Sequence, residues 1–354
     1  MKQYKNYISS LKGFACLLVM IGHFLGLIKY SPDLSAKFPF FAFLKQIRLD
    51  FLLNESFWLQ LFFIASGYLI AQSSIKNIKA LGVKSLTRFL RLGFPILFAN
   101  CIIFILYLLI GFKNADTSAL FTNEWFQGTY NTSLNFIMLL KSPFDTLLFS
   151  NCYFNSTYWV LSQMFFASLL IYVFLYVSSK FQKPLYKTLL YLAFLMATFL
   201  ISKIIFGCFL SLGLAIYEEQ ITKRMNTLIY IGLLAVSFLL CVFAYNTYTI
   251  FFFFLCLMLV CPKIHVINTF LSYKPFDYIG KISFGIFVFH WPVICSVGSY
   301  IILRLADGIG LTGALFVAIA VSLVISVILA IIFNLTAEKW CSQITRKLQN
   351  KLMS

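Results

Sequence analysis

The chain alternates long apolar stretches with short polar segments that carry most of its charges. Ten stretches have roughly the length that an α-helix needs to cross a bilayer, about 20 residues. They lie at about 9–29, 55–74, 92–111, 158–178, 185–202, 204–217, 226–244, 247–262, 281–302 and 311–335. Runs such as 251–255 show none of the apolar–polar alternation of a membrane β-barrel. The pattern therefore predicts an all-α, polytopic membrane protein with about ten transmembrane helices.

Polar interruptions and flanking residues set the boundaries of these spans. The stretch 185–217 is too long for one crossing and is broken at Ser202-Lys203, so we interpret it as two helices. The first span follows basic residues but has no small-residue cleavage site after it, which favours a retained span over a signal peptide. The tail after residue 335 is too short for a further domain. We expect residues 1–354 to form a single integral-membrane domain.

Composition supports the same class of protein. Hydrophobic residues make up 61% of the chain and charged residues only 11%, where soluble proteins carry about 25% charged residues. This balance argues against a cytosolic enzyme, a disordered chain and a disulfide-rich secreted domain. The nine cysteines fall mostly inside predicted spans and show no metal-ligand spacing, so we expect no metal site and no outer disulfide.

The net charge of +17 reflects 28 Lys and Arg against 11 Asp and Glu. With the N-terminus in the cytoplasm, 20 of the 28 basic residues fall in cytoplasmic segments and 8 in outer ones. Lys and Arg collect in cytoplasmic loops of membrane proteins, and only an even number of spans preserves this asymmetry. The charge therefore predicts both termini in the cytoplasm and needs no nucleic-acid partner.

Two of the three histidines, His23 and His290, fall inside predicted spans, where polar groups are costly and often functional. Lys12 precedes His23 by eleven residues. In an α-helix this spacing turns about 20° past three full turns, so both side chains share one face, roughly 16 Å apart. We interpret Lys12 as a cation that attracts an anion at the cytoplasmic mouth and His23 as a general base deeper in the membrane. The structural alternative is a topological anchor and a satisfied core histidine.

A second pair of cations stands before the third predicted span. Arg88 and Arg91 are three residues apart and therefore share a helix face. Such a pair at a cytoplasmic entrance can bind phosphate oxygens bidentately, although anchoring the span is the alternative. Ser66 interrupts the second span, and Pro292 interrupts the ninth, where it removes a backbone hydrogen bond.

Five short motifs follow one another along nearly the whole chain. They are Lys12 with His23 after ten intervening residues, Phe62-Phe63-Ile64-Ala65-Ser66-Gly67, Arg88-Phe89-Leu90-Arg91 before Pro95, Tyr158-Trp159-Val160-Leu161, and Gly280-Lys281-Ile282-Ser283-Phe284 through His290-Trp291-Pro292. In this order they resemble the acyltransferase-3 family of integral-membrane acyltransferases, which includes O-acetylases of bacterial O-antigen and other envelope glycans. The sequence departs from the family pattern at two customary carboxylates, where Gln60 and Gln163-Met164 stand, and Glu338-Lys339-Trp340 lacks a customary proline.

The resemblance implies a multi-pass enzyme of the inner membrane that transfers an acyl group, usually acetyl, from cytoplasmic acyl-CoA to a sugar hydroxyl of a glycan or glycolipid. It implies His23 as the catalytic base, with Lys12, Arg88 and Arg91 binding the donor. Residues assigned to substrate positioning are Ser66, His290 and, for sugar stacking, Trp159. Direct transfer and an acyl-enzyme route both stay open, as do the acceptor, the acyl chain length and the oligomeric state.

A carrier is the main alternative from another class, either a flippase for lipid-linked glycans or a secondary transporter. Coupled transporters usually hold carboxylates within the membrane. Here Glu55, Glu218 and Glu338 lie at the ends of predicted spans, which argues against proton coupling but not against a flippase. A glycan polymerase that works through a large outer loop is a third alternative.

Overall fold

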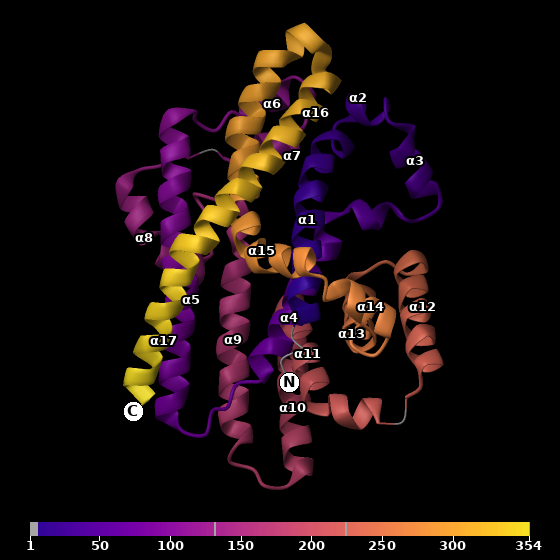
Figure 1. The fold of residues 1–354 in the computed structure, drawn as a ribbon, viewed down its shortest axis with the longest axis vertical. Coiled ribbons are helices and arrows are strands. Elements are labelled where there is room, and N and C mark those ends of the chain that lie inside the picture. Colours follow the sequence, from indigo (N-terminus) through magenta and orange to yellow (C-terminus); the bar gives the residue numbers. More distant parts are fainter. Residues whose placement is uncertain (1–5, 131, 224, 354) are drawn as a thin grey trace.

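The computed structural model describes residues 6–130, 132–223 and 225–353, and this part of the chain consists of helices and connecting loops without a strand. Lys2, Lys5 and Arg224, which contribute to the predicted cytoplasmic charge, lie outside the described residues. Long helices run side by side along the longest axis of the molecule (Figure 1). The all-helical prediction is confirmed for the described residues.

In chain order the helices are α1 (Asn6–Lys29), α2 (Pro32–Ser35), α3 (Pro39–Gln46), η2 (Asp50–Leu53), α4 (Glu55–Ala71), α5 (Ile78–Leu109), α6 (Asn114–Ala119), α7 (Glu124–Gln127), α8 (Phe136–Phe149), η3 (Ser156–Tyr158), α9 (Trp159–Ser178), α10 (Pro184–Ile201), α11 (Lys203–Thr222), α12 (Thr227–Phe243), α13 (Thr247–Val260), α14 (His265–Leu271), α15 (Lys274–Val293), η4 (Ile294–Gly298), α16 (Ser299–Phe333), η5 (Asn334–Glu338) and α17 (Lys339–Met353). Each of the ten apolar stretches coincides with one or more of these helices. The break predicted at Ser202-Lys203 separates α10 from α11.

By length and composition, six of the described helices can cross a membrane, or seven if α13 and α14 count as one span. The helices α4 and α12 are apolar but shorter, with 17 residues each. The helical run Lys274–Met353 is counted as one of the six, although it turns back on itself at Gly310. The φ of +76° at Gly310 suits a residue without a Cβ. Figure 1 shows this turn at the top of the molecule. The structure thus supports a membrane protein with several long apolar helices, and the number ten stays a prediction.

Several helix boundaries differ from the sequence prediction, most of all at the start of the third span. The third predicted span, 92–111, belongs to a longer helix, α5, which begins at Ile78 after the Asn77 side chain accepts a hydrogen bond from the Ala80 amide. Arg88 and Arg91 therefore lie within the helix and not at its entrance. The eighth predicted span, 247–262, matches α13, which ends at Val260, and α14 then continues at an angle of 96° to it.

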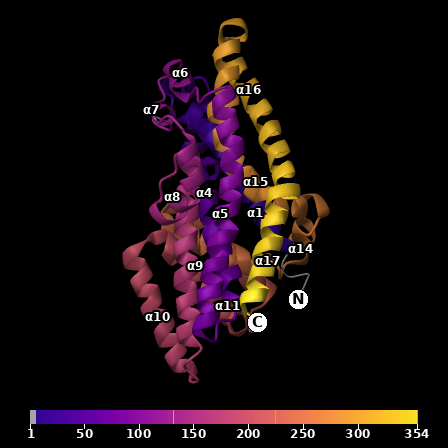
Figure 2. The same ribbon diagram turned by 90° about the vertical axis from the view of Figure 1, so that its left-hand side faces the viewer.

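The outer faces of the bundle carry large apolar side chains, as lipid contact requires. Leu109, Leu200 and Leu228 are 77%, 79% and 77% exposed. At the start of α1 and the end of α17 the chain lies in the same half of the molecule in both views (Figures 1 and 2). A chain that crosses the membrane an even number of times has both termini on the same side. The assignment of that side to the cytoplasm rests on the charge pattern.

The contact between α1 and α15 brings distant parts of the sequence together at the centre of the bundle. A Cβ at Gly13 of α1 would come within 2.6 Å of the Gly280 backbone nitrogen in α15. A Cβ at Gly280 would in turn collide with the backbone carbonyl of Ser9. Further along the same interface, the Cys16 thiol donates a hydrogen bond to the Ser283 carbonyl at 3.0 Å. The two backbones therefore approach closely only because both positions are glycine.

Replacing Gly280 by alanine tests this packing. The added methyl group meets backbone atoms that cannot rotate away, so we expect Gly280→Ala to destabilise the protein by about 1–3 kcal/mol and to lower its thermal unfolding midpoint in detergent. Gly232→Ala in α12 is the control, since nothing lies within 4 Å of a Cβ there and alanine is the better helix former. Equal midpoints for the two variants would show that the contact does not limit stability.

Candidate active site

Three adjacent cavities follow one another through the bundle, and each is named here by its lining. The basic cavity, of about 330 Å³, is lined by Lys84, Arg88, Arg91 and Arg346 among others. The central cavity, of about 350 Å³, shares Arg88 and Arg91 with it. The histidine cavity, of about 590 Å³, contains His23 in its lining. The cavities thus form a series with cations at one end and a histidine at the other.

The central cavity brings together four of the residues that the sequence singled out: Lys12, Ser66, Arg88 and Arg91. They come from three different helices, α1, α4 and α5. The Arg88 Nε donates a hydrogen bond to the Ser168 hydroxyl at 3.0 Å, which holds the guanidinium against α9. The grouping expected of these basic residues is therefore present.

Direct ion pairs do not neutralise these cations. Among the described residues, the ion pairs within 4.0 Å are Lys113–Asp116 and Lys281–Asp277, and neither involves the cavities. Glu338 also lines the central cavity and interacts electrostatically with Lys12 and Arg91 over a longer distance. The central and basic cavities together therefore keep an excess of positive charge that favours an anionic ligand.

Val160 and Phe287 line both the central cavity and the histidine cavity, so they form the boundary between the two. Phe287 projects from α15 and is only 5% exposed. Lys12 and His23 lie on opposite sides of this boundary, on the same face of α1, as their spacing predicts.

His23 has a defined tautomer. Its Nδ1 lies 2.8 Å from the Val19 carbonyl oxygen, and because a carbonyl only accepts, Nδ1 must carry the proton. In the neutral imidazole the Nε2 atom then has the lone pair, which is the form a general base needs. The rings of Trp291 and Trp125 lie 4.8 Å and 6.2 Å from the His23 ring, centroid to centroid. The imidazole is thus held between aromatic side chains at the wall of a cavity.

His290 lies directly beside His23, with 5.0 Å between the ring centroids. It is 1% exposed, and its Nδ1 donates to the Phe287 carbonyl at 2.8 Å. It is absent from the described linings of all three cavities, and its Nε2 has no partner among the described residues. Ser66 lies in the central cavity, so the structure does not bring Ser66 and His290 to one point. Trp159 lines the histidine cavity and is 41% exposed.

Sequence reasoning missed residues that complete the histidine cavity. Glu55, at the start of α4, lines the cavity and interacts electrostatically with His23. Glu124 and Trp125 line it from α7, within the long loop between α5 and α8. Their position at a span end and in a loop gave no periodic signal. The packing of α4 against α1 brings Glu55 to His23, and the fold of the loop over α1 brings Glu124 and Trp125 there.

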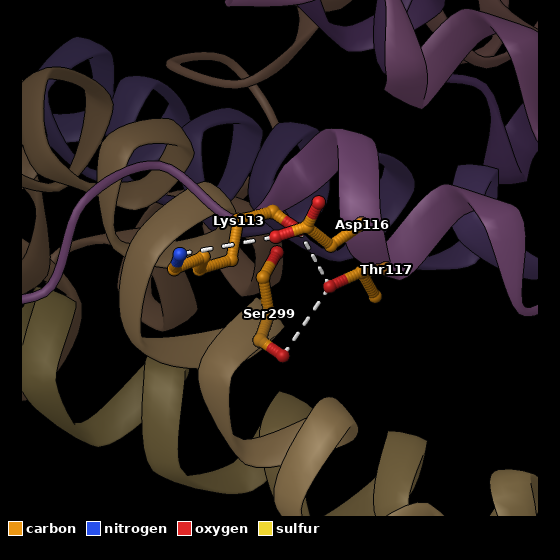
Figure 3. Close-up of polar contacts among 4 residues, drawn as sticks. All are labelled: Lys113, Asp116, Thr117 and Ser299. Carbon is orange, nitrogen blue, oxygen red and sulfur yellow. Dashed lines mark hydrogen bonds and ion pairs between the residues drawn. The ribbon is translucent and has the colours of Figure 1, made fainter.

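Polar contacts hold this loop on the bundle. The Asn123 side chain donates to the Gly26 and Leu27 carbonyls, at 3.3 and 3.2 Å, at the end of α1 beyond His23. On the other side, the Thr117 hydroxyl contacts the Ser299 carbonyl at 3.3 Å next to the Lys113–Asp116 ion pair (Figure 3). These contacts fix α6 and α7 on the bundle, with α7 at the histidine cavity.

The cysteines do not supply a nucleophile to the histidine cavity, because none of them is in its described lining. Burial raises the pKa of the Cys152 thiol, in the loop between α8 and η3, to about 12, so that this thiol stays protonated at neutral pH.

Comparison with known proteins identifies the family. A family model described as an acyltransferase domain matches residues 5–333, nearly the whole chain. Neither the curated proteins nor the solved structures gave a significant match. The match covers all five motifs of the sequence and both histidines that meet in the structure. The chain is therefore an acyltransferase rather than a non-enzymatic carrier, and it belongs to the acyltransferase-3 family of membrane acyltransferases.

Proposed function

We propose that this enzyme is a membrane O-acyltransferase of the inner membrane that moves an acyl group, in the first place acetyl, from cytoplasmic acyl-CoA to a hydroxyl of an envelope glycan or glycolipid. One observation carries the proposal. His23, with Nε2 as its basic atom, lines a cavity that borders a second cavity lined by Lys12, Arg88 and Arg91. A donor with a phosphate-bearing end and a long, thin thioester arm suits this arrangement.

The proposed reaction uses these groups in a simple order. The acceptor hydroxyl gives its proton to Nε2 of His23 while its oxygen attacks the thioester carbonyl. The new C–O bond forms, the C–S bond breaks, and the CoA sulfur leaves as a thiol after taking the proton from His23. An acyl-His23 intermediate would need the same placement of His23 and the donor, and in that case the acyl group moves in two steps.

Trp291 suits the role of oxyanion donor. Its indole N–H is buried and has no partner among the described residues, although the side chain lines the histidine cavity beside His23. Unpaired buried donors are costly, so a partner that forms only during the reaction is a reasonable function for this one. His290, packed against His23, then acts by positioning that ring, and Ser66 contacts the donor arm from the central cavity.

The lining of the histidine cavity favours a neutral or amino-bearing sugar as acceptor. It includes two carboxylates, Glu55 and Glu124, and no Lys or Arg among the described residues. Trp125 and Trp159 offer flat apolar faces to a sugar ring, and the carboxylates can accept hydrogen bonds from its hydroxyls. Glu55 also stabilises the charged imidazole that forms when His23 takes the proton.

Transfer of labelled acetyl from acetyl-CoA to an envelope-glycan extract, by the purified protein in vesicles, tests the function. We expect His23→Ala to lower kcat by about 100- to 10,000-fold, the range of a lost general base. His265→Ala is the matched control, since His265 is exposed at the start of α14 and outside the described cavity linings. Transfer by His23→Ala at the wild-type rate would refute the assignment of the base.

Arg91→Ala tests the donor end. Loss of a charge-assisted hydrogen bond to phosphate should raise KM for acetyl-CoA about tenfold with little change in kcat. Lys79→Ala, on the same helix but outside the described cavity linings, should leave KM unchanged. An equal KM for acetyl-CoA in both variants would refute the assignment of Arg91 to phosphate binding.

Trp291→Phe keeps the ring and removes the N–H. If the indole donates to the oxyanion, kcat should fall by roughly 100- to 1,000-fold while KM for the donor stays near its wild-type value. Phe126→Leu, a change in a ring that packs on Trp291 at 5.8 Å, controls for general disturbance of the packing. An unchanged kcat in Trp291→Phe would leave the indole with a structural role only.

A further inference from the structure

The C-terminal helix α17 contributes one wall of the basic cavity. Its residues in the lining are Ser342, Thr345, Arg346 and Gln349, with the spacing i, i+3, i+4, i+7 that places side chains on one helix face. The helix lies along α5 in both views (Figures 1 and 2), and Cys341 and Thr345 are buried, 1% and 4% exposed. α17 is therefore a fixed part of the cavity wall.

The opposite wall comes from α5 and shows a matching stripe. Lys84, Arg88 and Arg91 follow one another at i, i+4 and i+7, and together with Arg346 they give the cavity four basic side chains. No Asp or Glu is among the described residues that line it. Thr87 and Thr345 add hydroxyl groups from the two helices. Cations and hydroxyls without carboxylates are the chemistry that binds phosphate oxygens.

The order of the cavities indicates which phosphates of the donor each of these cations would bind. Arg88 and Arg91 line both the basic and the central cavity, so they meet the phosphates nearest the thioester arm. Lys84 and Arg346 line the basic cavity only, which is separated from the histidine cavity by the central one. They lie at the end of the series, where the ribose of a bound CoA would present its 3′-phosphate.

We propose that α17, which follows the part of the chain matched by the family, supplies a phosphate subsite through Arg346, and that with Lys84 this subsite binds the 3′-phosphate of the CoA donor. The inference rests on the proposed function, because it takes acyl-CoA as the donor. An anionic lipid headgroup offers the same phosphate chemistry, and the experiment separates the two sources.

The experiment measures binding of CoA and of 3′-dephospho-CoA to the purified full-length protein by titration calorimetry, in vesicles of neutral lipid. We expect wild type to bind CoA about tenfold more tightly than 3′-dephospho-CoA, and Arg346→Gln to lose this difference by weakening CoA alone. Lys347→Gln is the matched control. It removes a positive charge from the next position of the same helix, whose side chain is outside the described cavity linings.

Three results would overturn the proposed subsite, and a fourth would refute the proposed function instead. Equal affinity of Arg346→Gln and wild type for CoA would overturn the subsite, as would an Arg346→Gln effect that is the same for both nucleotides. An effect of Arg346→Gln that appears only when the vesicles contain phosphatidylglycerol would assign the cation to a lipid headgroup and also overturn it. Tight, 3′-phosphate-dependent CoA binding without acyl transfer would instead refute the proposed function and leave the subsite intact.

Discussion

The close contact of α1 with α15 is the constraint on which the candidate site depends. Gly13 and Gly280 let the two backbones approach until an added Cβ would meet main-chain atoms. This contact sets the separation and rotation of the helices, and two turns or more further along it brings the His23 ring within 5.0 Å of His290 and 4.8 Å of Trp291. In a bilayer the apolar surface of a helix gains little from leaving lipid for protein, so such small-residue contacts are what hold spans in register.

Charge is distributed along the cavities in a way that suits two different ligands. Cations surround the basic and central cavities, whereas the histidine cavity has Glu55 and Glu124 in its lining. Val160 and Phe287 form an apolar boundary between the two regions. Charges inside a low-dielectric bundle act strongly on a bound group, so the cationic cavities favour anions and the histidine cavity disfavours them. Under the proposed function, a donor with phosphates and an uncharged or cationic acceptor would reach His23 from separate sides.

Segments outside the long spans complete both ends of this path. The loop with α6 and α7 brings Glu124 and Trp125 to His23, and α17 brings Arg346 to the basic cavity. The loop is fixed by the hydrogen bonds of Asn123 to the end of α1, and α17 by its packing along α5, where the Phe98 and Trp340 rings lie 5.5 Å apart. A long apolar helix can be positioned by lipid and neighbouring helices alone, but a short polar loop needs specific bonds to adopt one conformation.

The sequence by itself determined the helical class, the apolar segments and most of the breaks between them, because bilayer thickness and helix geometry translate directly into runs of residues. It also predicted that Lys12 and His23 share a face, since both lie on one helix of fixed pitch. Only the tertiary structure decided that Phe287 separates these two residues, that Glu55 and Trp125 join His23, and that Arg346 joins Arg88. These groupings depend on how helices distant in the chain pack against one another, and no local periodicity encodes the contacts between them.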